Sequence, residues 1–322
     1  DSKLKVPNLF VVGAAKSGTT ALYNFLNQHR DIYMSPLKEP HFFCTDIRRE
    51  NFSNFFKNRS VSPAHLKHYL SKKRLSKMQI AFVDNERDYF QLFREHSDEK
   101  YLGEVSNGYL LSTVAAQNIY NYNPEAKIIM ILRDPCERAF SQWLREFQAN
   151  LSRSSNFVDD VNYDYSLNDP VYHQSSYTLV EQGLYFNQVK RYLDLFPHNN
   201  IKILFHHDLK NSPEKVKNDL FSFLNVENYN INFKKKYNAT KMPRNKLIAG
   251  IFNQIRPKNP FLRDLLPKKI KSFILNIIFS SDKKGMFLLS KKEKIEIFNH
   301  FKNDINHLEK LLNVKLDQWK ID

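Results

Sequence analysis

VVGAAKSGTT, residues 11–20, joins an apolar run to a helical pattern and decides the fold. Its glycines, Gly13 and Gly18, lie five residues apart and hydroxyl residues close the stretch, as in the phosphate-binding loop of nucleoside-triphosphate enzymes. Those enzymes carry a lysine directly after the second glycine, where this chain has Thr19, and the loop's own lysine is Lys16. Backbone N–H groups at the start of a helix bind anions, so the stretch predicts a phosphate site without a triphosphate ligand. The alternative is an ordinary strand-to-helix turn.

Hydrophobic periodicity extends this pattern along the chain. Short apolar and β-branched runs predict strands at residues 9–12, 32–34, 101–105, 127–132 and 201–205. Apolar residues at helical spacing predict helices at residues 19–28, 135–150, 184–196 and 291–319. Strands that alternate with helices indicate an α/β fold, a P-loop-type parallel β-sheet flanked by helices on both faces. We expect a single domain over residues 1–322.

One region departs from the pattern. In residues 251–290, lysines and arginines surround the apolar run FILNIIF. We interpret this region as a basic helical insertion or decoration, and a helix on a membrane surface is the alternative.

Composition narrows the class of protein. The 26 Phe and 16 Tyr argue against disorder, and the net charge of +15 predicts attraction to polyanions, anionic membranes or phosphorylated small molecules, with a merely solvated lysine surface as the alternative. Cys44 and Cys136 are too few for a disulfide framework and lack metal-ligand spacing. No apolar run approaches the roughly 20 residues of a membrane span. We expect a cytoplasmic protein with peripheral membrane contact at most, although the start at Asp1 leaves a removed N-terminal anchor open.

A second stretch, ILRDPCERAFSQW at residues 131–143, places Arg133 at the carboxyl end of a buried strand. Open α/β sheets bind ligands there, and Ser141 follows about two helical turns later. An arginine with a hydroxyl suits a second phosphate, because the guanidinium can bind it through two hydrogen bonds. The alternative is a structural salt bridge from Arg133 to Asp134 or Glu137.

A third stretch, SPLKEPHFF at residues 35–43, offers a carboxylate and an imidazole. If the segment is extended, Glu39 and His41 project from the same face, and Pro40 leaves the edge unpaired. The pair is a candidate general base, and a surface charge at Glu39 is the alternative.

Together the three stretches resemble the sulfotransferases that use 3′-phosphoadenosine 5′-phosphosulfate (PAPS), particularly the glycan-modifying branch with the heparan sulfate sulfotransferases and bacterial relatives. KSGTTAL is similar to that family's 5′-phosphosulfate loop, ILRDPCERAFSQW to its 3′-phosphate segment, and KEPHFF to the stretch with its catalytic glutamate. Weaker similarity, as in GEVSNGYL and NATKMPRN, covers most of the chain. The resemblance accounts for the absence of a lysine directly after Gly18, because this donor carries a 5′-phosphosulfate and a separate 3′-phosphate, has no triphosphate and needs no metal.

The resemblance also implies roles for residues. Glu39 takes the proton of an acceptor hydroxyl or amine, Lys16 stabilises the leaving phosphate, and His41 is the alternative base because another branch uses histidine. The implied 5′ site consists of Lys16, Ser17, Gly18, Thr19 and Thr20. The implied 3′ site consists of Arg133 and Ser141. Lys241 and Arg244 join the nucleotide site, because NATKMPRN falls where members fold a basic loop over the nucleotide. The product is 3′,5′-adenosine bisphosphate, and no metal is expected.

The chain also departs from the family. Heparan sulfate 3-O-sulfotransferases carry a lysine at the position of Val105 and an aspartate at that of Cys44, and animal Golgi members have a disulfide loop that is absent here. Lys38 is a candidate replacement for the missing lysine. Heparan sulfate is therefore not implied as the acceptor. We expect an anionic carbohydrate such as a polysaccharide, capsule or lipopolysaccharide, with a lipid, an acyl chain or a small metabolite as the alternative.

Two other classes of protein fit less well. A P-loop kinase needs a lysine beside Gly18 and an acidic residue at the strand end for Mg²⁺, and this chain has Thr19 and Arg133 there. A nucleic-acid-binding module would use the positive charge, but zinc-ligand spacing and an RNA-binding aromatic signature are both absent from the sequence. No nucleic-acid partner is predicted.

Overall fold

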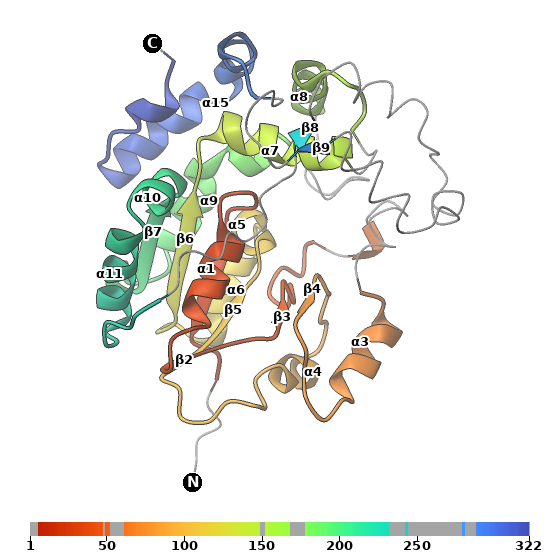
Figure 1. Ribbon diagram of the computed structural model, residues 1–322, viewed down its shortest axis with the longest axis vertical. Coiled ribbons are helices and arrows are strands. Elements are labelled where there is room, and N and C mark those ends of the chain that lie inside the picture. Colours follow the sequence, from red (N-terminus) through yellow and green to blue (C-terminus); the bar gives the residue numbers. More distant parts are fainter. Residues whose placement is uncertain are drawn as a thin grey trace.

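The computed structural model describes residues 6–47, 49–51, 61–148, 152–167, 178–231, 242–243, 279–280 and 288–321. A five-stranded sheet lies at its centre (Figure 1). The strands are β1 (Leu9–Gly13), β2 (Ile32–Met34), β5 (Tyr101–Val105), β6 (Lys127–Leu132) and β7 (Ile201–Phe205). Their order is β2-β5-β1-β6-β7, and every pairing is parallel. The five predicted strands are confirmed, with β1 one residue longer than expected.

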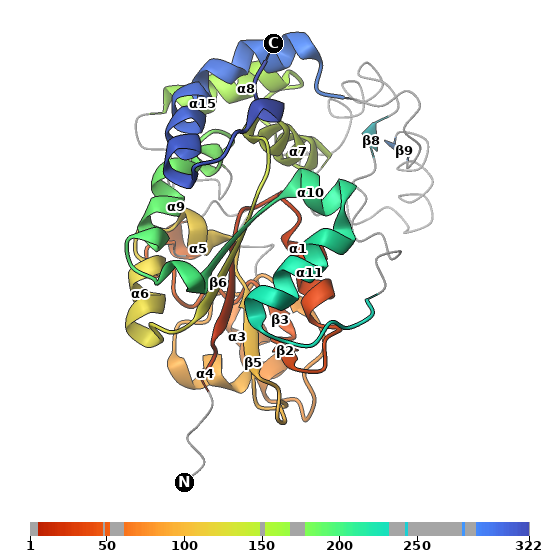
Figure 2. The ribbon, with the colours of Figure 1, turned by 90° about the vertical axis from the view of Figure 1, so that its left-hand side faces the viewer.

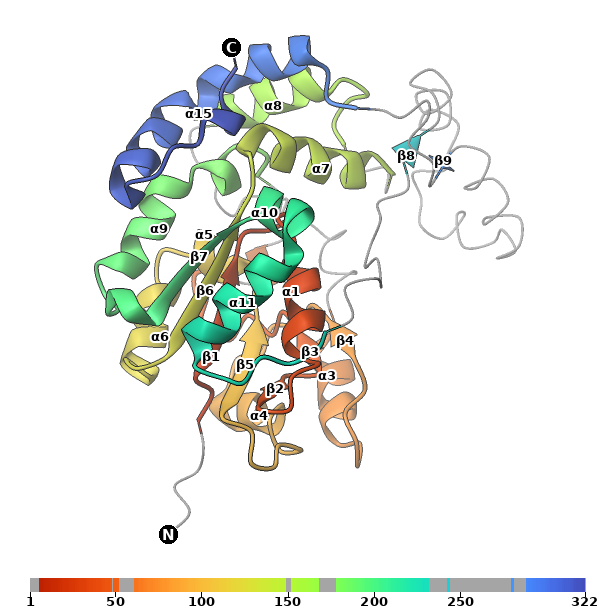
Figure 3. The ribbon, with the colours of Figure 1, turned by 60° about the vertical axis from the view of Figure 1, so that its left-hand side comes forward.

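Helices cover both faces of the sheet, as predicted. Along β1, Leu9 and Val11 face a core built with α1 (Thr19–Leu26) and α11 (Pro213–Leu224). Phe10 and Val12 face the opposite core, which includes side chains of α6 (Ala115–Tyr122) and α9 (Tyr185–Leu193). Figures 2 and 3 show α1 and α11 on one side of β6 and α6 and α9 on the other. Both faces of the central strand are buried, which explains its continuous apolar sequence.

The remaining elements connect and extend this core. The helices are α3 (Pro63–Leu70), α4 (Glu86–Gln91), α5 (Gly108–Leu111), α7 (Pro135–Gln148), α8 (Phe157–Ser166), α10 (His206–Asn211) and α15 (Lys291–Leu312). The short strands are β3 (Leu37–Lys38), β4 (Met78–Gln79), β8 (Met242–Pro243) and β9 (Phe279–Ser280). The 3-10 helices are η1 (Arg49–Asn51), η2 (Glu181–Gly183), η3 (His198–Asn200) and η4 (Asp317–Trp319).

Two predicted helices need correction. The helix expected over residues 291–319 ends at Leu312, because Asn313 adopts a left-handed conformation (φ 51°) that caps α15. In the region 251–290, Phe279–Ser280 forms strand β9, which pairs antiparallel with Met242–Pro243. Residues 251–278 and 281–287 of that region lie outside the described residues, and its domain role stays a prediction. Each helix within the described ranges is too short or too polar to cross a bilayer.

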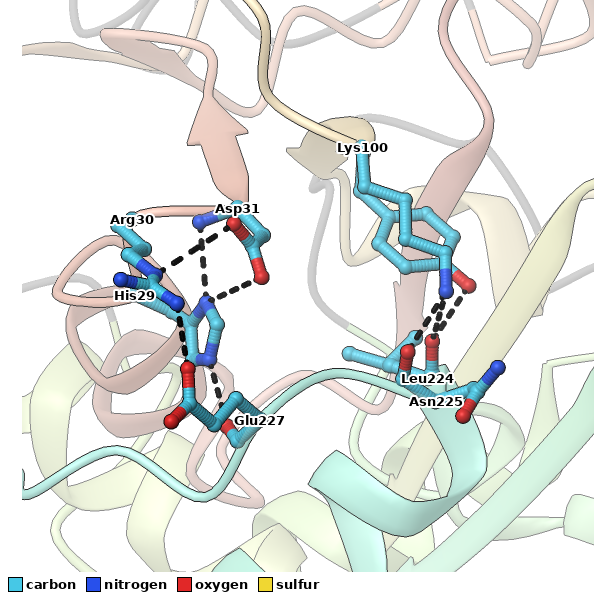
Figure 4. Close-up of polar contacts among 8 residues, drawn as sticks. His29, Arg30, Asp31, Lys100, Leu224, Asn225 and Glu227 are labelled. Carbon is cyan, nitrogen blue, oxygen red and sulfur yellow. Dashed lines mark hydrogen bonds and ion pairs between the residues drawn. The ribbon is translucent and has the colours of Figure 1, made fainter.

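Polar contacts fix the end of α11 at the amino ends of the strands (Figure 4). Lys100 Nζ donates hydrogen bonds to the carbonyl oxygens of Leu224 (3.1 Å) and Asn225 (2.7 Å). His29 Nε2 lies 2.9 Å from the carbonyl oxygen of Glu227, whose carboxylate is paired with the neighbouring Arg30. These contacts lie at the amino ends of the strands. The three stretches singled out in the sequence lie at the opposite, carboxyl ends.

Candidate functional site

The loop between β1 and α1 depends on its two glycines. Gly18, at the N-cap of α1, has φ +110°, which L side chains rarely adopt. At Gly13, a Cβ atom would lie 2.7 Å from Cβ of Leu110, which is closer than van der Waals contact allows. The sequence spacing therefore reflects one special backbone conformation and one close packing contact.

The start of α1 leaves backbone donors free. The N–H groups of Ala21 and Leu22 donate to the carbonyl of Gly18. Within the described chain, the N–H groups of Gly18, Thr19 and Thr20 have no protein acceptor, and the first turn of α1 holds no acidic residue. This geometry provides an anion site reinforced by the helix dipole.

Ser17 differs from its neighbours in the loop. Its side chain is completely buried and its N–H group donates to the carbonyl of Ala14 at 3.3 Å. The Ser17 side chain therefore points into the protein interior, whereas Lys16 and Thr20 are only half-buried.

Lys16 carries an unneutralised charge. Its backbone is left-handed (φ 66°), and no ion pair or hydrogen bond of its ammonium occurs in the described part of the chain. Burial, followed by the positive charges of Arg145, Arg133 and Arg138, lowers the pKa of Lys16 to about 8. Glu146, whose charge opposes this shift, has its own pKa raised to about 8 by burial. The cationic cluster is therefore arranged to attract an anion.

Arg133 connects two of the predicted segments. Its Nη1 donates to the carbonyl oxygen of Lys16 at 3.2 Å, so the strand-end arginine lies directly against the loop. Its Nη2 also pairs with Glu137 at 3.1 Å, as one alternative anticipated, while Asp134 pairs with Lys294 at 2.7 Å. Glu137 is half-exposed, so the ion pair is weak and leaves the guanidinium available to a ligand.

Helix α7 adds a hydroxyl and a further cation. It starts directly beyond the carboxyl end of β6, and Figure 3 shows it crossing above α1 and α10. Among the described residues, no side-chain hydrogen bond engages the half-buried Ser141. Arg145 follows one turn later on the same face and is exposed. Burial aside, its charge is the strongest influence that lowers the pKa of Lys16, and it also contributes to lowering the pKa of Glu39. The sequence reasoning missed Arg145, although its i,i+4 spacing from Ser141 is visible.

The segment with Glu39 and His41 is not extended, contrary to the expectation. Both residues are left-handed, with φ 64° and 53°, on either side of Pro40. This turn still brings the side chains together, and Glu39 Oε2 lies 3.9 Å from His41 Nε2. The edge is also not left unpaired, because the carbonyl of Pro40 accepts a hydrogen bond from the N–H of Val83 at 2.9 Å.

Only one of the two carboxylate oxygens of Glu39 accepts hydrogen bonds from the described residues. Lys38 Nζ (2.8 Å) and Asn107 Nδ2 (3.1 Å) both donate to its Oε1. Burial, the largest single influence, raises the pKa of Glu39, but the charge and hydrogen bond of Lys38 together with the charges of His41 and Arg145 outweigh it, so the pKa lies below its usual value. The carboxylate is therefore ionised at neutral pH, and Oε2 is available to accept a proton. Lys38, the candidate replacement for the lysine absent at Val105, is buried and paired with Glu39, and that role stays a prediction.

His41 is held as a neutral ring. Its Nδ1 lies 3.3 Å from the carbonyl of Ala81, and its ring stacks on Phe82 with centroids 4.8 Å apart. Burial lowers the pKa of His41, so the ring is uncharged at neutral pH. A Cβ atom at Gly108 would come within 3.0 Å of His41 Cδ2, so the absence of a side chain there leaves room for the imidazole. Donation from Nδ1 to Ala81 leaves Nε2 as a proton acceptor beside Glu39.

Some predicted features lie beyond this site. Lys241 and Arg244 fall outside the described residues. In the described ranges, no group of three or more histidine, cysteine, aspartate or glutamate side chains could hold a metal ion.

Known proteins resemble the chain in sequence and fold. Residues 7–230 match the sulfotransferase family. The membrane-associated sulfotransferase kil1 of Dictyostelium discoideum is 20% identical over 90% of this chain and 67% of its own length. Carbohydrate sulfotransferase 15 of Rattus norvegicus is 24% identical over 69% of the chain, and bifunctional heparan sulfate N-deacetylase/N-sulfotransferase 1 of Mus musculus is 26% identical over 69%. The matches span only 44% and 22% of these two relatives.

A solved structure shares the fold. The sulfotransferase from Alicyclobacillus acidocaldarius superposes with a TM-score of 0.67 at 24% identity, over 98% of this chain and 99% of that one. Because the family match spans more than half of the sequence and includes the β1 loop, the Glu39 segment and α7, this chain belongs to the sulfotransferase family.

Proposed function

We propose that the protein transfers the sulfuryl group of PAPS to a hydroxyl or amine of a carbohydrate. The observation that carries the proposal is the hydrogen bond from Arg133 Nη1 to the carbonyl of Lys16, 3.2 Å long. It joins two anion-binding segments into one surface, as a donor with two separate phosphates requires. A triphosphate would instead need a run of contacts along the loop.

The donor's two ends would bind different residues. The 5′-phosphosulfate lies on the loop formed by Lys16, Ser17, Gly18, Thr19 and Thr20, in which the Ser17 side chain is buried. The 3′-phosphate lies against Arg133 and Ser141, where the guanidinium exchanges its weak contact with the half-exposed Glu137 for the phosphate. Lys241 and Arg244 complete the nucleotide site in this proposal, and no metal takes part.

The transfer would use the two charged groups at the edge of the sheet. The acceptor oxygen or nitrogen forms a bond to sulfur while the bond between sulfur and the 5′-phosphate oxygen breaks. Oε2 of Glu39 accepts the acceptor's proton, and Lys16 neutralises the charge that develops on the leaving phosphate. His41 Nε2, 3.9 Å from Glu39, orients the acceptor and is the second candidate for the base.

The acceptor is proposed to be an anionic carbohydrate. Two relatives are named for carbohydrate and heparan sulfate substrates, the chain carries a net charge of +15, and Arg145 is exposed beside the reacting groups. A cytoplasmic location stays a prediction, because the relative from Dictyostelium discoideum is named as membrane-associated.

Two measurements test the proposal. In calorimetry, 3′,5′-adenosine bisphosphate should bind without Mg²⁺ and far more tightly than ATP, and equal binding or a strict metal requirement would overturn the donor. Radiolabelled PAPS should label N-desulfated heparan sulfate or chondroitin, two uronate-containing polysaccharides. Label found only in lipid or small-metabolite fractions would overturn the carbohydrate acceptor and leave the donor intact.

A further inference from the structure

Glu104, near the end of β5, is a fully buried carboxyl group without a counter-ion among the described residues. Three hydroxyl groups donate to it: Tyr89 (3.0 Å) and Tyr109 (2.6 Å) to Oε1, and Ser106 (2.7 Å) to Oε2. Burial raises the pKa of Glu104 to about 7 although the three hydrogen bonds oppose it. An uncompensated charge in a core is costly, so its position calls for an explanation.

The carboxylate dictates the direction of the hydrogen bonds around it. An ionised carboxylate only accepts, and each hydroxyl has a single hydrogen. Ser106 and Tyr109 therefore direct their hydrogens inward and turn lone pairs outward. Those lone pairs accept the backbone N–H groups of His41 (3.1 Å) and Phe43 (3.3 Å).

These two N–H groups belong to the segment that carries the reacting side chains. The backbone there is left-handed at Glu39 and His41, a conformation that persists only where the surroundings impose it. We propose that Glu104 is a positioning residue, which holds this segment through the hydroxyls of Ser106 and Tyr109. The inference rests on the proposed role of Glu39 as the base.

The variant Glu104→Gln tests the direction of the hydrogen bonds. Its amide oxygen can still accept from the two tyrosines, but its NH₂ group faces the Ser106 hydroxyl, whose hydrogen then loses its acceptor. Ser106 is no longer held with a lone pair directed at the N–H of His41, so the link to His41 weakens, and in Ser106→Ala it is removed. We expect kcat to fall about 10²-fold in each variant, as a displacement near 1 Å does, with unchanged affinity for 3′,5′-adenosine bisphosphate. The double variant should be no slower than the slower single variant, because both act on the same link.

Tyr89→Phe is the matched control. Tyr89 donates to the same oxygen as Tyr109, but the hydrogen bonds of its hydroxyl do not reach the catalytic segment. Its loss removes a hydrogen bond that stabilises the charged carboxylate, so the pKa of Glu104 should rise. The variant should keep the plateau value of kcat while the acid limb of the pH–rate profile moves to higher pH.

The decrease of kcat at low pH is a second measurement that tests the role of Glu104. Wild-type kcat should fall as pH drops through about 7, because protonation of Glu104 reverses the same hydrogen bond, and Glu104→Gln should lack this limb. Within the described ranges, the titratable groups whose charges interact with that of Glu104 include Tyr89, Tyr109, Tyr122, Tyr192, Cys44 and Glu39. Burial raises the pKa of each of these tyrosines and of Cys44. The pKa of Glu39 is lowered, because Lys38, His41 and Arg145 together outweigh the effect of burial, so Glu104 alone among these seven groups titrates near neutrality.

Amide hydrogen exchange needs no acceptor substrate. With 3′,5′-adenosine bisphosphate bound, the N–H of His41 should exchange faster in Glu104→Gln and Ser106→Ala than in the wild type or in Tyr89→Phe. Wild-type exchange and wild-type kcat in both Glu104→Gln and Ser106→Ala would overturn the inference. If Glu39→Gln retains full turnover on N-desulfated heparan sulfate and chondroitin, the proposed base fails instead, and the exchange experiment separates the two failures.

Discussion

The β1 loop and the Glu39 segment each hold one charged side chain near the carboxyl ends of the strands, but the electrostatic surroundings of the two charges differ. Both place a side chain with a proposed role in the reaction on left-handed backbone at the carboxyl ends of the strands, with φ 66° at Lys16 and 64° at Glu39. Among the described residues, the ammonium of Lys16 lies near arginines and has no counter-ion, whereas the carboxylate of Glu39 is paired with Lys38 at 2.8 Å. The difference indicates that the positive charge of the loop is available to an anion, whereas Glu39, the proposed base, is already held in its charged form.

The largest expected effect is that of replacing Glu39. Glu39→Gln should lower kcat by about 10² to 10⁴, because a general base acts in the transition state. Affinity for 3′,5′-adenosine bisphosphate should stay unchanged, since the loop does not depend on this carboxylate. Steady-state kinetics with calorimetry measure both, and His41→Ala is the paired comparison. If His41→Ala is inactive while Glu39→Gln turns over normally, the two roles must be exchanged.

The next effect tests the anion site formed by the β1 loop and Arg133. Arg133→Ala should weaken 3′,5′-adenosine bisphosphate binding by roughly 10- to 10²-fold, as expected for loss of a charge-assisted hydrogen bond. Binding of 5′-AMP, which has no 3′-phosphate, should change far less. Titration calorimetry with both ligands gives the ratio, and Arg133→Lys serves as the control that keeps the charge but not the paired donors. A uniform loss for both ligands would mean that Arg133 only supports the loop through the carbonyl of Lys16.

The same comparison explains what the sequence could predict. The strands, the loop glycines and the Arg133 stretch were readable because each depends on local spacing: an apolar run, a positive φ at Gly18, a strand that ends in a turn. The neighbourhood of Glu39 was misjudged because long-range pairing fixes it. Its carbonyl accepts the N–H of Ala81 at 3.1 Å, and its own N–H donates to Val105 at 2.7 Å.

Charge neighbours were equally hard to foresee. The sequence places Lys38 beside Glu39 but does not show that the lysine is buried against that carboxylate, which follows from the pairing of β3 with β4. The exposed Arg145 was missed because α7 brings it across the carboxyl ends of the strands. In the described ranges, the positions that local rules missed are those where separate segments meet at the site.

A smaller effect follows from the pKa of Lys16. Burial and the neighbouring arginines lower this pKa to about 8 in the free protein, and a bound anion should raise it again. Binding of 3′,5′-adenosine bisphosphate should therefore take up a proton near pH 8, and affinity should fall about tenfold between pH 7 and pH 9. Calorimetry in buffers of different ionisation enthalpy measures the proton uptake. Lys16→Met should abolish it, and a wild-type affinity that stays constant up to pH 9 would contradict the assignment.

The smallest effect concerns stability, where the two segments should respond with opposite signs. Lys16→Met removes a repelled, partly buried charge and should raise the free energy of unfolding of the free protein by about 1 kcal/mol, a value limited by solvent screening. Glu39→Gln removes the partner of the buried Lys38 and should lower that free energy by about 1–3 kcal/mol. Because the folded-state pKa of Lys16 lies below its ordinary 10.5, the unfolded chain binds more protons between about pH 8 and 10.5, and wild-type stability gains from this group as pH rises through that window. The advantage of Lys16→Met should therefore be largest below pH 8 and shrink toward pH 10.5. Urea unfolding of both variants at pH 7 and pH 9.5 tests the signs, and equal destabilisation by both variants would show that the charge of Lys16 is neutralised within the free protein.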